Sequence, residues 1–281
     1  MATDAFLAVL LGALLHASWN AVIKAGRDKF MDTILVSSSA ALLAVLVVPF
    51  LPLPAPASWP YVAASVAIHV VYFALVAAAY RTGDMSHAYP LMRGTGPLFV
   101  ALFSGMLLGE YLTPAAWIGV VLICGSILAS ALCRTGPGSE SRTPTMLALL
   151  NAGIIACYTR TDGAGVRLSG HAPAYTMWVF IGTALPLLAF AAARRPADLA
   201  VHVRRRWAVA LGGGACTLAS YALALWAMTK APIAAVSALR ETSILFALAL
   251  GAFVLKEPLR PVRLVAGAGI ALGVVVLRLS S

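Results

Sequence analysis

The chain has few charged residues for its length. Only 11% of its 281 residues are Asp, Glu, Lys or Arg, whereas 61% are hydrophobic; an average soluble domain has about 25% charged residues. Such a chain cannot cover an apolar interior with a polar surface, and this excludes a soluble globular protein. A helix needs roughly 20 apolar residues to cross a bilayer. The composition therefore predicts a membrane protein with little room for a soluble domain.

Cysteine and acidic residues are also scarce. The four cysteines lie in apolar sequence without the spacing of a metal site or a disulfide framework, so we expect them to pack and expect no metal or cofactor. Lys and Arg outnumber Asp and Glu by 20 to 10. The basic residues form short clusters between apolar runs, such as Arg194/Arg195 and Arg204–Arg206. This pattern is typical of topology signals and headgroup contacts, and we expect no nucleic-acid partner.

Apolar runs follow one another along the whole chain. They span residues 4–22, 32–51, 59–80, 86–108, 114–132, 144–160, 173–193, 206–228, 232–254 and 262–279. The predicted fold class is therefore an all-α integral membrane protein with ten transmembrane helices. The polar stretch 134–144 separates a first five-helix repeat (1–133) from a second (145–281).

The second half repeats part of the first. Shifting residues 80–114 forward by 147 positions aligns ten identical residues, among them Arg93 with Arg240, Glu110 with Glu257 and Pro114 with Pro261. Weak internal symmetry in a multi-spanning protein indicates a transporter built from repeats. Because five helices per half is odd, the two repeats are expected to be inverted, an arrangement that permits alternating access.

The Lys and Arg counts predict the orientation. Under the ten-helix assignment, the connections after the odd-numbered helices carry 14 basic residues and the opposite side carries four, including Arg160 and Arg167. The positive-inside rule then places both termini outside. Pairs such as Gly105/Gly109 allow close helix packing. Such glycine pairs allow close packing of helices within one chain as readily as between two chains, so they do not indicate an oligomeric state.

Arg93 and Arg240 are the strongest candidates for substrate binding. A charged side chain near the middle of a bilayer costs at least about 2.5–3.5 kcal/mol on insertion scales and usually faces a polar interior. Snorkelling to an interface is the alternative, and Glu241 offers a neighbouring counter-charge for Arg240. Two arginines in one cavity would favour an anionic substrate, because guanidinium binds carboxylate and phosphonate in a fork. Pro90, Gly94, Gly96 and Pro97 favour a kink near Arg93.

Further substrate-binding candidates lie on other helices. Residues four apart share a helical face, which groups His16 with Asn20 and Tyr89 with Arg93. His69 and Tyr72 share a face too, and each histidine has packing as its alternative role. Trp19 aligns with Tyr158 at an offset of 139 positions. The remaining candidates are Tyr221, for which packing is the more common role, and Glu241.

The other carboxylates suggest structural roles. Glu110 and Glu257 each follow a long apolar helix and precede a short turn, where they would cap a helix or hold the loop. Glu241 is the best-placed carboxylate for proton coupling, although Arg240 beside it would keep it ionised. Proton coupling stays open, because the sequence shows no convincing pair of relay residues.

The chain resembles the EamA branch of the drug/metabolite transporter superfamily over its whole length. The resemblance rests on the segments Gly109–Gly119 and Lys256–Pro261, and on the early Trp19. Two segments, His16–Lys24 and Tyr158–Arg167, are similar to a subgroup associated with phosphonate utilisation. The resemblance implies a 5+5 inverted-repeat carrier of small metabolites. Its central cavity would be lined by helices 1, 3, 4, 6, 8 and 9, on two of which Arg93 and Arg240 lie.

These observations predict a transporter of a small polar metabolite in the inner (cytoplasmic) membrane of a bacterium. The substrate is expected to be anionic or zwitterionic, either a phosphonate such as 2-aminoethylphosphonate or an amino acid. The alternatives are an intramembrane enzyme, which would need converging catalytic groups, and a non-transporting receptor or assembly protein. The lipid bilayer is the other expected partner, and we do not expect an enzyme.

Truncation of Glu110 or Glu257 is expected to lower the stability of the protein without acting on substrate specificity. Thermal unfolding of Glu110→Ala in detergent, compared with the unmodified chain, measures this effect. An unchanged unfolding temperature would contradict the structural role.

Overall fold

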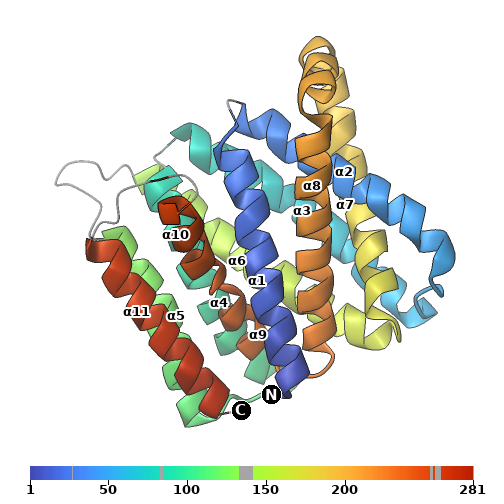
Figure 1. The fold of residues 1–281 in the computed structure, drawn as a ribbon. Helices are drawn as coiled ribbons and strands as arrows, with labels where there is room; N and C mark the ends of the chain where they lie inside the picture. The colour runs from blue at the N-terminus through green and yellow to red at the C-terminus, as the bar shows by residue number, and fades with distance from the viewer. Residues whose placement is uncertain (27, 83–84, 133–141, 254–255, 257–260, 281) are drawn as a thin grey trace.

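A computed structural model describes residues 1–26, 28–82, 85–132, 142–253, 256 and 261–280. Within these ranges the chain contains α-helices and two short 3₁₀ turns and no strands (Figure 1). The helices are α1 (Thr3–Lys24), α2 (Lys29–Val47), α3 (Trp59–Thr82), α4 (Met85–Leu108), α5 (Pro114–Leu132), α6 (Arg142–Leu168), α7 (Ala172–Arg194), α8 (Pro196–Met228), α9 (Ile233–Arg240), α10 (Ser243–Phe253) and α11 (Pro261–Leu279). The 3₁₀ turns, η1 (Val48–Phe50) and η2 (Pro56–Ser58), lie in the proline-rich connection from α2 to α3.

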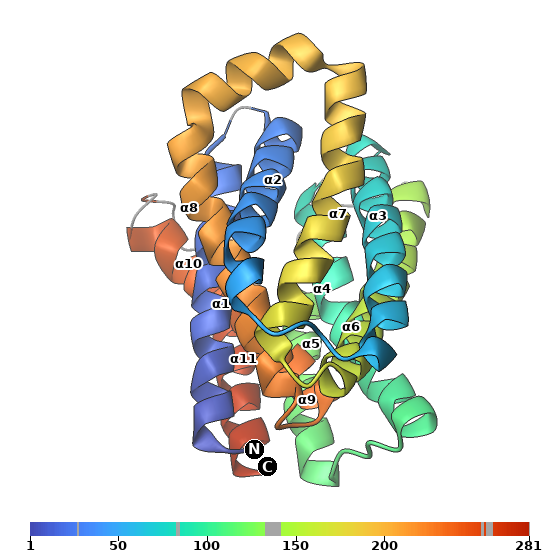
Figure 2. The same cartoon turned by 90° about the vertical axis from the view of Figure 1, so that its right-hand side faces the viewer.

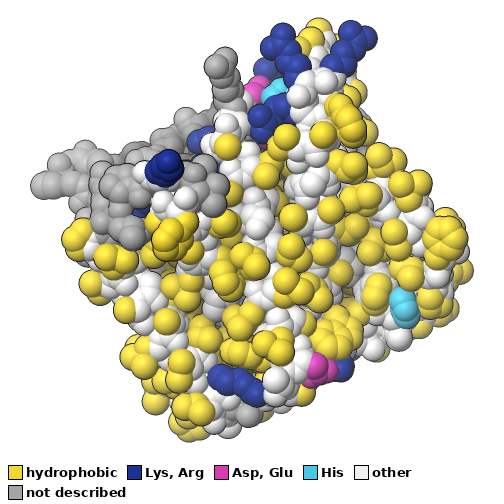
Figure 3. Space-filling model, in the orientation of Figure 1, with side chains coloured by type: hydrophobic (Ala, Val, Ile, Leu, Met, Phe, Trp, Pro, Cys, Tyr) yellow, Lys and Arg dark blue, Asp and Glu magenta, His cyan; other side chains and the backbone are white. Residues whose placement is uncertain are grey.

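The outer surface is that of a protein surrounded by lipid. Among the described residues, eight helical segments are long and apolar enough to cross a membrane. Hydrophobic side chains spread over the middle of the molecule, and the visible Lys and Arg side chains gather toward its two ends (Figure 3). Helices α4 and α6 are not among the eight segments. Both carry charged or polar side chains that face the protein interior, as described below.

Three helices differ from the predicted apolar runs. Helix α6 continues to Leu168 rather than ending at 160, so Arg160 and Arg167 lie within a helix and not in a loop. Helix α8 begins at Pro196 rather than 206. The predicted ninth helix is divided into α9 and α10. Hydrophobicity missed the additional turns of α6 because other helices, and not lipid, surround its polar residues. The predicted linker 134–144 lies largely outside the described residues.

The additional turns of α8 form part of an arch with the end of α7. This arch passes over one end of α2 (Figure 2). Buried Asp32 of α2 forms an ion pair with Arg206 of α8 (2.7 Å) and a hydrogen bond with His202 of the same helix (3.0 Å). Asp28, which caps α2, pairs with Arg195 at 3.1 Å. Arg206 of the basic cluster 204–206, and Arg195 before it, therefore take part in charged contacts between helices.

The helices pack in pairs drawn from the two halves of the chain. Helix α1 packs along α8, α3 along α6, α5 along α11 and α4 against α9. The two termini meet at one end of the molecule (Figure 1), where Arg278 donates to the carbonyl oxygen of Met1 at 2.5 Å. Both termini therefore lie on the same face, as the sequence predicts. The assignment of that face to the outside stays a prediction.

The helix break near the arginines lies in the second half of the chain. Helix α4 continues through Pro90 and Pro97, where a kink was expected. Between α9 and α10, by contrast, the amides of Glu241 and Thr242 bond to carbonyls three residues earlier, each at 3.0 Å. Such 3₁₀ bonding inside a helical run often marks a hinge.

Glu110 holds the start of α9 in place. Its carboxylate accepts a hydrogen bond from the amide of Ile233 at 3.0 Å and forms an ion pair with Arg167. Arg167 also donates to the carbonyl oxygens of Met228 and Ala231, at 2.7 and 3.0 Å. Glu110 thus ties together α6 and the turn before α9, rather than capping α5, the helix that follows it. Glu257 lies outside the described residues.

The crossing of α5 and α11 depends on glycine. A Cβ atom added to Gly119 would lie 2.9 Å from Cβ of Leu277 and 3.0 Å from the carbonyl oxygen of Gly273. These distances are too short, and the neighbouring atoms cannot rotate away. By contrast, a Cβ atom on Gly125 of the same helix would have no neighbour within 4 Å.

We expect Gly119→Ala to lower the free energy of unfolding by about 1–3 kcal/mol, because overpacking forces the two helices apart. The matched control Gly125→Ala is expected to raise it slightly, by about 0.4–1 kcal/mol, since alanine restricts the unfolded chain. Thermal unfolding of both variants in detergent tests the pair. Equal effects of the two substitutions would show that the close crossing contributes nothing.

Candidate functional site

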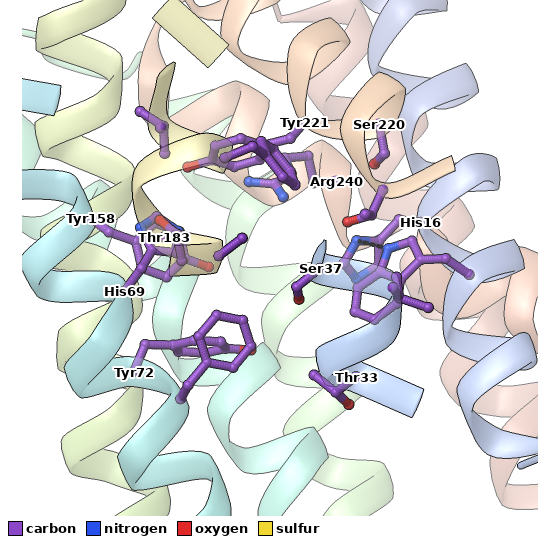
Figure 4. A pocket seen from close by; sticks show the side chains of 17 residues that line it. His16, Thr33, Ser37, His69, Tyr72, Tyr158, Thr183, Ser220, Tyr221 and Arg240 are labelled. Carbon is purple, nitrogen blue, oxygen red and sulfur yellow. Dashed lines mark hydrogen bonds between the residues drawn. The ribbon is translucent and has the colours of Figure 1, made fainter. Parts of the chain in front are cut away.

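A cavity of about 130 Å³ lies among α1, α2, α3, α6, α7, α8 and α9. Seven of the eleven predicted site residues line it. They are His16, Trp19, His69, Tyr72, Tyr158, Tyr221 and Arg240. Ser37 and Thr33 of α2 lie on the same side of the space as His16, across from Tyr158, His69 and Tyr72 (Figure 4).

His16 presents a hydrogen-bond donor to this cavity. The indole nitrogen of Trp19 donates to Nδ1 of His16 at 3.3 Å. Since an accepting nitrogen carries no proton, the imidazole is neutral and its Nε2 holds the proton. The predicted partner on the same face, Asn20, instead donates to the backbone carbonyl oxygen of His16 at 2.7 Å. Asn20 does not line the cavity, and its role in substrate binding stays a prediction.

In His69 the other ring nitrogen carries the proton. Its Nδ1 lies 2.9 Å from the carbonyl oxygen of Ser65, so Nδ1 carries a proton; in the neutral form of this tautomer Nε2 is an acceptor. The ring stacks on Tyr158 with centroids 4.4 Å apart, and Tyr72 meets both rings edge-on. The result is an aromatic cluster from α3 and α6 on one side of the cavity (Figure 4).

Arg240 lies over the ring of Tyr221, with its guanidinium carbon 5.1 Å from the ring centroid. This is a cation–π contact between the end of α9 and α8. Among the described residues no carboxylate forms an ion pair with Arg240. The alternative role of Glu241 as the ion-pair partner of Arg240 is not seen among the described residues, because Glu241 pairs with Arg93.

Glu241 is paired with Arg93 instead. Nε of Arg93 lies 2.9 Å from a carboxylate oxygen of Glu241, and its terminal nitrogen donates to Oγ of Ser243 at 2.9 Å. Both charged side chains are largely buried, with exposed fractions of 14% and 5%. Neither lines the cavity, so the expectation that both arginines face one cavity is not met for Arg93. A direct part for Arg93 and Glu241 in substrate binding stays a prediction.

The internal repeat explains this asymmetry. Under the 147-residue offset, Glu241 and Ser243 are the counterparts of Gly94 and Gly96. Glycine is needed at position 94, because a Cβ atom there would lie 2.8 Å from Leu128 of α5. The first half therefore has no carboxylate to offer Arg240, while the second half offers Glu241 to Arg93.

Tyr89 does not line the cavity that contains Arg240. It lines a second cavity between α4, α5, α10 and α11, together with Lys24 and Arg263. Its assignment to the same binding site as Arg93 was based on helical spacing alone. Tyr89 as a substrate-binding residue stays a prediction.

The sequence analysis missed Asp162 as a functional residue. Its carboxylate is fully buried in α6 and accepts hydrogen bonds from the hydroxyls of Tyr175, at 3.0 Å, and of Tyr221. Thr183 was missed as well; it lines the cavity, and its hydroxyl has no partner within the described part of the chain. Asp162 lies in the segment Tyr158–Arg167, four residues after Tyr158. Its helical spacing from Tyr158 was the signal that could have identified it, had the sixth helix not been ended at 160.

These features define a multi-spanning helical membrane protein with an internal cavity that contains one arginine without a carboxylate partner. The profile of the EamA-like transporter family matches the chain twice, over residues 4–132 and 143–279. The chain therefore belongs to the EamA-like transporter family and is a membrane transporter by family.

Solved structures support the fold. One, described as "Crystal structure of protein", superposes with a TM-score of 0.78 over the full length of both chains at 19% sequence identity. At that identity the likeness concerns the fold alone. No curated protein matches the chain.

The Arg93–Glu241 pair predicts a double-mutant result. Arg93→Met leaves Glu241 buried without a counter-charge, so we expect a loss of about 3–5 kcal/mol in the free energy of unfolding. Adding Glu241→Gln should restore much of it, because the remaining groups are neutral. Thermal unfolding of the two single variants and the double variant measures the coupling. Strictly additive effects would contradict the ion pair.

Proposed function

We propose that this protein carries a small metabolite with one anionic group across the cytoplasmic membrane of a bacterium, and that Arg240 binds that group. The observation that carries the proposal is the charge balance at the cavity. Glu241 pairs with Arg93, whereas among the described residues the guanidinium of Arg240 has only the Tyr221 ring as its partner. A guanidinium on an aromatic face keeps its donors for a carboxylate or phosphonate.

The opposite wall suits a cationic group. His69 offers an acceptor nitrogen, and the rings of Tyr72 and Tyr158 offer π faces to an ammonium group. The hydroxyl of Thr183 is a further polar group without a protein partner among the described residues. A zwitterion with its anionic end at Arg240 would use both walls. This favours an aminophosphonate such as 2-aminoethylphosphonate, or an amino acid.

The size of the cavity favours a small substrate. Pockets for drug-sized ligands have volumes of roughly 300–1,000 Å³, whereas this one holds about 130 Å³. That volume suits a metabolite of a few non-hydrogen atoms. The similarity of Tyr158–Arg167 to the phosphonate-associated subgroup supports the aminophosphonate among such metabolites.

Alternating access is the proposed mechanism, with residues 1–133 and 145–281 as two inverted five-helix repeats joined by 134–144. In such a repeat α1 corresponds to α6, and α3 corresponds to α8. The contact between α1 and α8 is therefore equivalent to the contact between α6 and α3, and the structure contains both. The 3₁₀ break after Arg240 supplies a hinge beside the cavity. Movement at this hinge would change the position of the anion-binding group.

The test is thermal stabilisation of the purified protein by a panel of phosphonates, amino acids, sugars and lipophilic cations. A ligand at 100 times its dissociation constant stabilises a protein that binds it only when folded by about 2.7 kcal/mol. We expect stabilisation by an anionic or zwitterionic compound, its loss in Arg240→Ala, and a weakened effect in Arg240→Lys, which keeps the charge but not the fork.

The control is Arg278→Lys, far from the cavity at the contact between the termini. It should leave the response to ligand unchanged. Stabilisation by sugars or cations that survives Arg240→Ala would overturn the assignment of Arg240, while leaving the transporter family unaffected.

A further inference from the structure

Asp162 is a buried carboxylate without a basic partner among the described residues. Its side chain is fully buried in α6, and both its oxygens accept hydrogen bonds from tyrosine hydroxyls. An ionised carboxylate inside a membrane protein normally pairs with a cation or marks an ion or proton pathway. Two phenol hydroxyls stabilise the negative charge only in part. The hydrogen-bond partners of Asp162 among the described residues are all neutral hydroxyls.

We propose that Asp162 binds the proton that is coupled to transport, with Tyr221 as its connection to the cavity. This inference rests on the proposed transport of an anionic metabolite, and it names the coupling ion and its site. Glu241, the carboxylate favoured by the sequence, is less suited to this part because it is already the ion-pair partner of Arg93, whose Nε lies 2.9 Å away.

The two tyrosines differ in what they can reach. Tyr221 lines the cavity, whereas Tyr175 is fully buried. A proton arriving at the hydroxyl oxygen of Tyr221 from the cavity can therefore be passed on. The O–H bond of Tyr221 breaks as its proton moves to Asp162, and the arriving proton forms the new O–H bond. Charge and atoms balance, and Tyr221 ends as a neutral phenol.

The hydrogen bonds around Asp162 must rearrange when it is protonated. The ionised carboxylate accepts from both hydroxyls, but a carboxylic acid donates through one of its oxygens. One tyrosine must then accept that bond and turn its own proton elsewhere. Tyr221 can direct its proton into the cavity, where substrate binds. Protonation thus changes a hydrogen-bonding group on the cavity wall.

Neighbouring groups on every packed helix define the electrostatics of this site. Tyr61 and His69 face it from α3, Tyr175 from α7 and Tyr221 from α8, while Tyr158 precedes it on α6. Arg93 and Glu241 act on Tyr158 and form a neutral pair. Arg240 of α9 acts on Tyr221 and His69. It is the one cation near the site without an ion pair among the described residues.

Arg240 couples the proton to the anion. Its guanidinium lies on the Tyr221 ring, whose hydroxyl bonds to Asp162. An anion bound to Arg240 offsets the positive charge that favours ionised Asp162. Anion binding and protonation of Asp162 therefore promote each other, which is the linkage required for a carrier that moves both together.

Backbone geometry brings the carboxylate and Tyr175 together. A Cβ atom at Gly165, three residues after Asp162, would lie 2.5 Å from the Tyr175 hydroxyl oxygen. Only glycine leaves room for that hydroxyl against α6. The Asp-Gly-Ala-Gly sequence of residues 162–165 thus builds a site for a carboxylate held by phenols.

The first experiment needs no ligand. Infrared difference spectra of the purified protein, recorded as the pH is lowered, detect the carbonyl stretch of a newly protonated carboxyl group. We expect a band that is absent in Asp162→Asn and retained in Glu241→Gln. Asparagine resembles the protonated acid in shape and hydrogen bonding, so the variant should fold. A band lost in Glu241→Gln but kept in Asp162→Asn would overturn the proposal.

The path through Tyr221 is tested on the same band. Transfer to heavy water shifts the band as the carboxyl proton exchanges. Tyr221→Phe should slow this exchange at least tenfold, whereas the matched variant Tyr175→Phe should leave its rate within twofold of the unmodified protein. Both variants keep Asp162, so this comparison decides the proposal even if Asp162→Asn does not fold. Equal rates in the two variants would exclude Tyr221 as the path.

The coupling is tested with taurine, a small zwitterion whose sulfonate stays ionised over the pH range used. Its dissociation constant should fall as the pH is lowered, by up to about tenfold per pH unit for one coupled proton. Asp162→Asn should bind it equally at every pH. If Asp162→Asn binds taurine tightly and with the same pH dependence as the unmodified protein, the coupling is contradicted, but anion binding at Arg240 is not. If the infrared band shows that Asp162 becomes protonated but no anion in the panel binds, the proposed substrate class is wrong and the proton site is unaffected.

Discussion

The ion pair between Arg93 and Glu241 sets the electrostatics of the whole cavity. It joins α4 of the first half to the break between α9 and α10 in the second half, and both side chains are largely removed from solvent and lipid. A single buried charge would be costly there, but the pair offsets most of that cost. Its main consequence is on the other arginine. Because Glu241 turns to Arg93, Arg240 keeps a charge without an acidic partner among the described residues, and that charge lies at the cavity.

The other carboxylates inside the protein are all hydrogen-bonded or paired, but the chemical nature of their partners differs. Glu110 binds Arg167 and the first amide of α9, and Asp32 binds Arg206 and His202, so both hold helices together at positions away from the cavity. Asp162 has only two tyrosine hydroxyls, one of which belongs to a cavity-lining residue. The charge of the partner thus separates the carboxylates that join helices, which have basic partners, from Asp162, whose partners are neutral hydroxyls. The same distinction separates Arg93, which is neutralised, from Arg240.

Much of the architecture was predictable because lipid imposes simple rules. Apolar runs in the sequence located most helices, and the internal sequence repeat related Arg93 to Arg240. The same rules failed for polar residues that are buried by protein. Hydropathy placed the end of the sixth helix at 160, and Asp162 was therefore not considered. Helical spacing could not show that Glu241 points to α4, because the chain breaks at that residue. Seven of the eleven predicted residues line the cavity. Arg93 and Glu241 bond to each other instead, Asn20 bonds to the backbone of α1, and Tyr89 lines a second cavity.

The central claim is that the cavity contains one available cation, Arg240. A crystal structure with selenate, an oxyanion whose anomalous scattering locates it directly, tests this without knowledge of the substrate. The account predicts an anomalous peak in the cavity within hydrogen-bond distance of the Arg240 guanidinium, with Arg93 still paired to Glu241. A peak at Arg93 with the ion pair opened would contradict it, and so would a cavity that binds no anion.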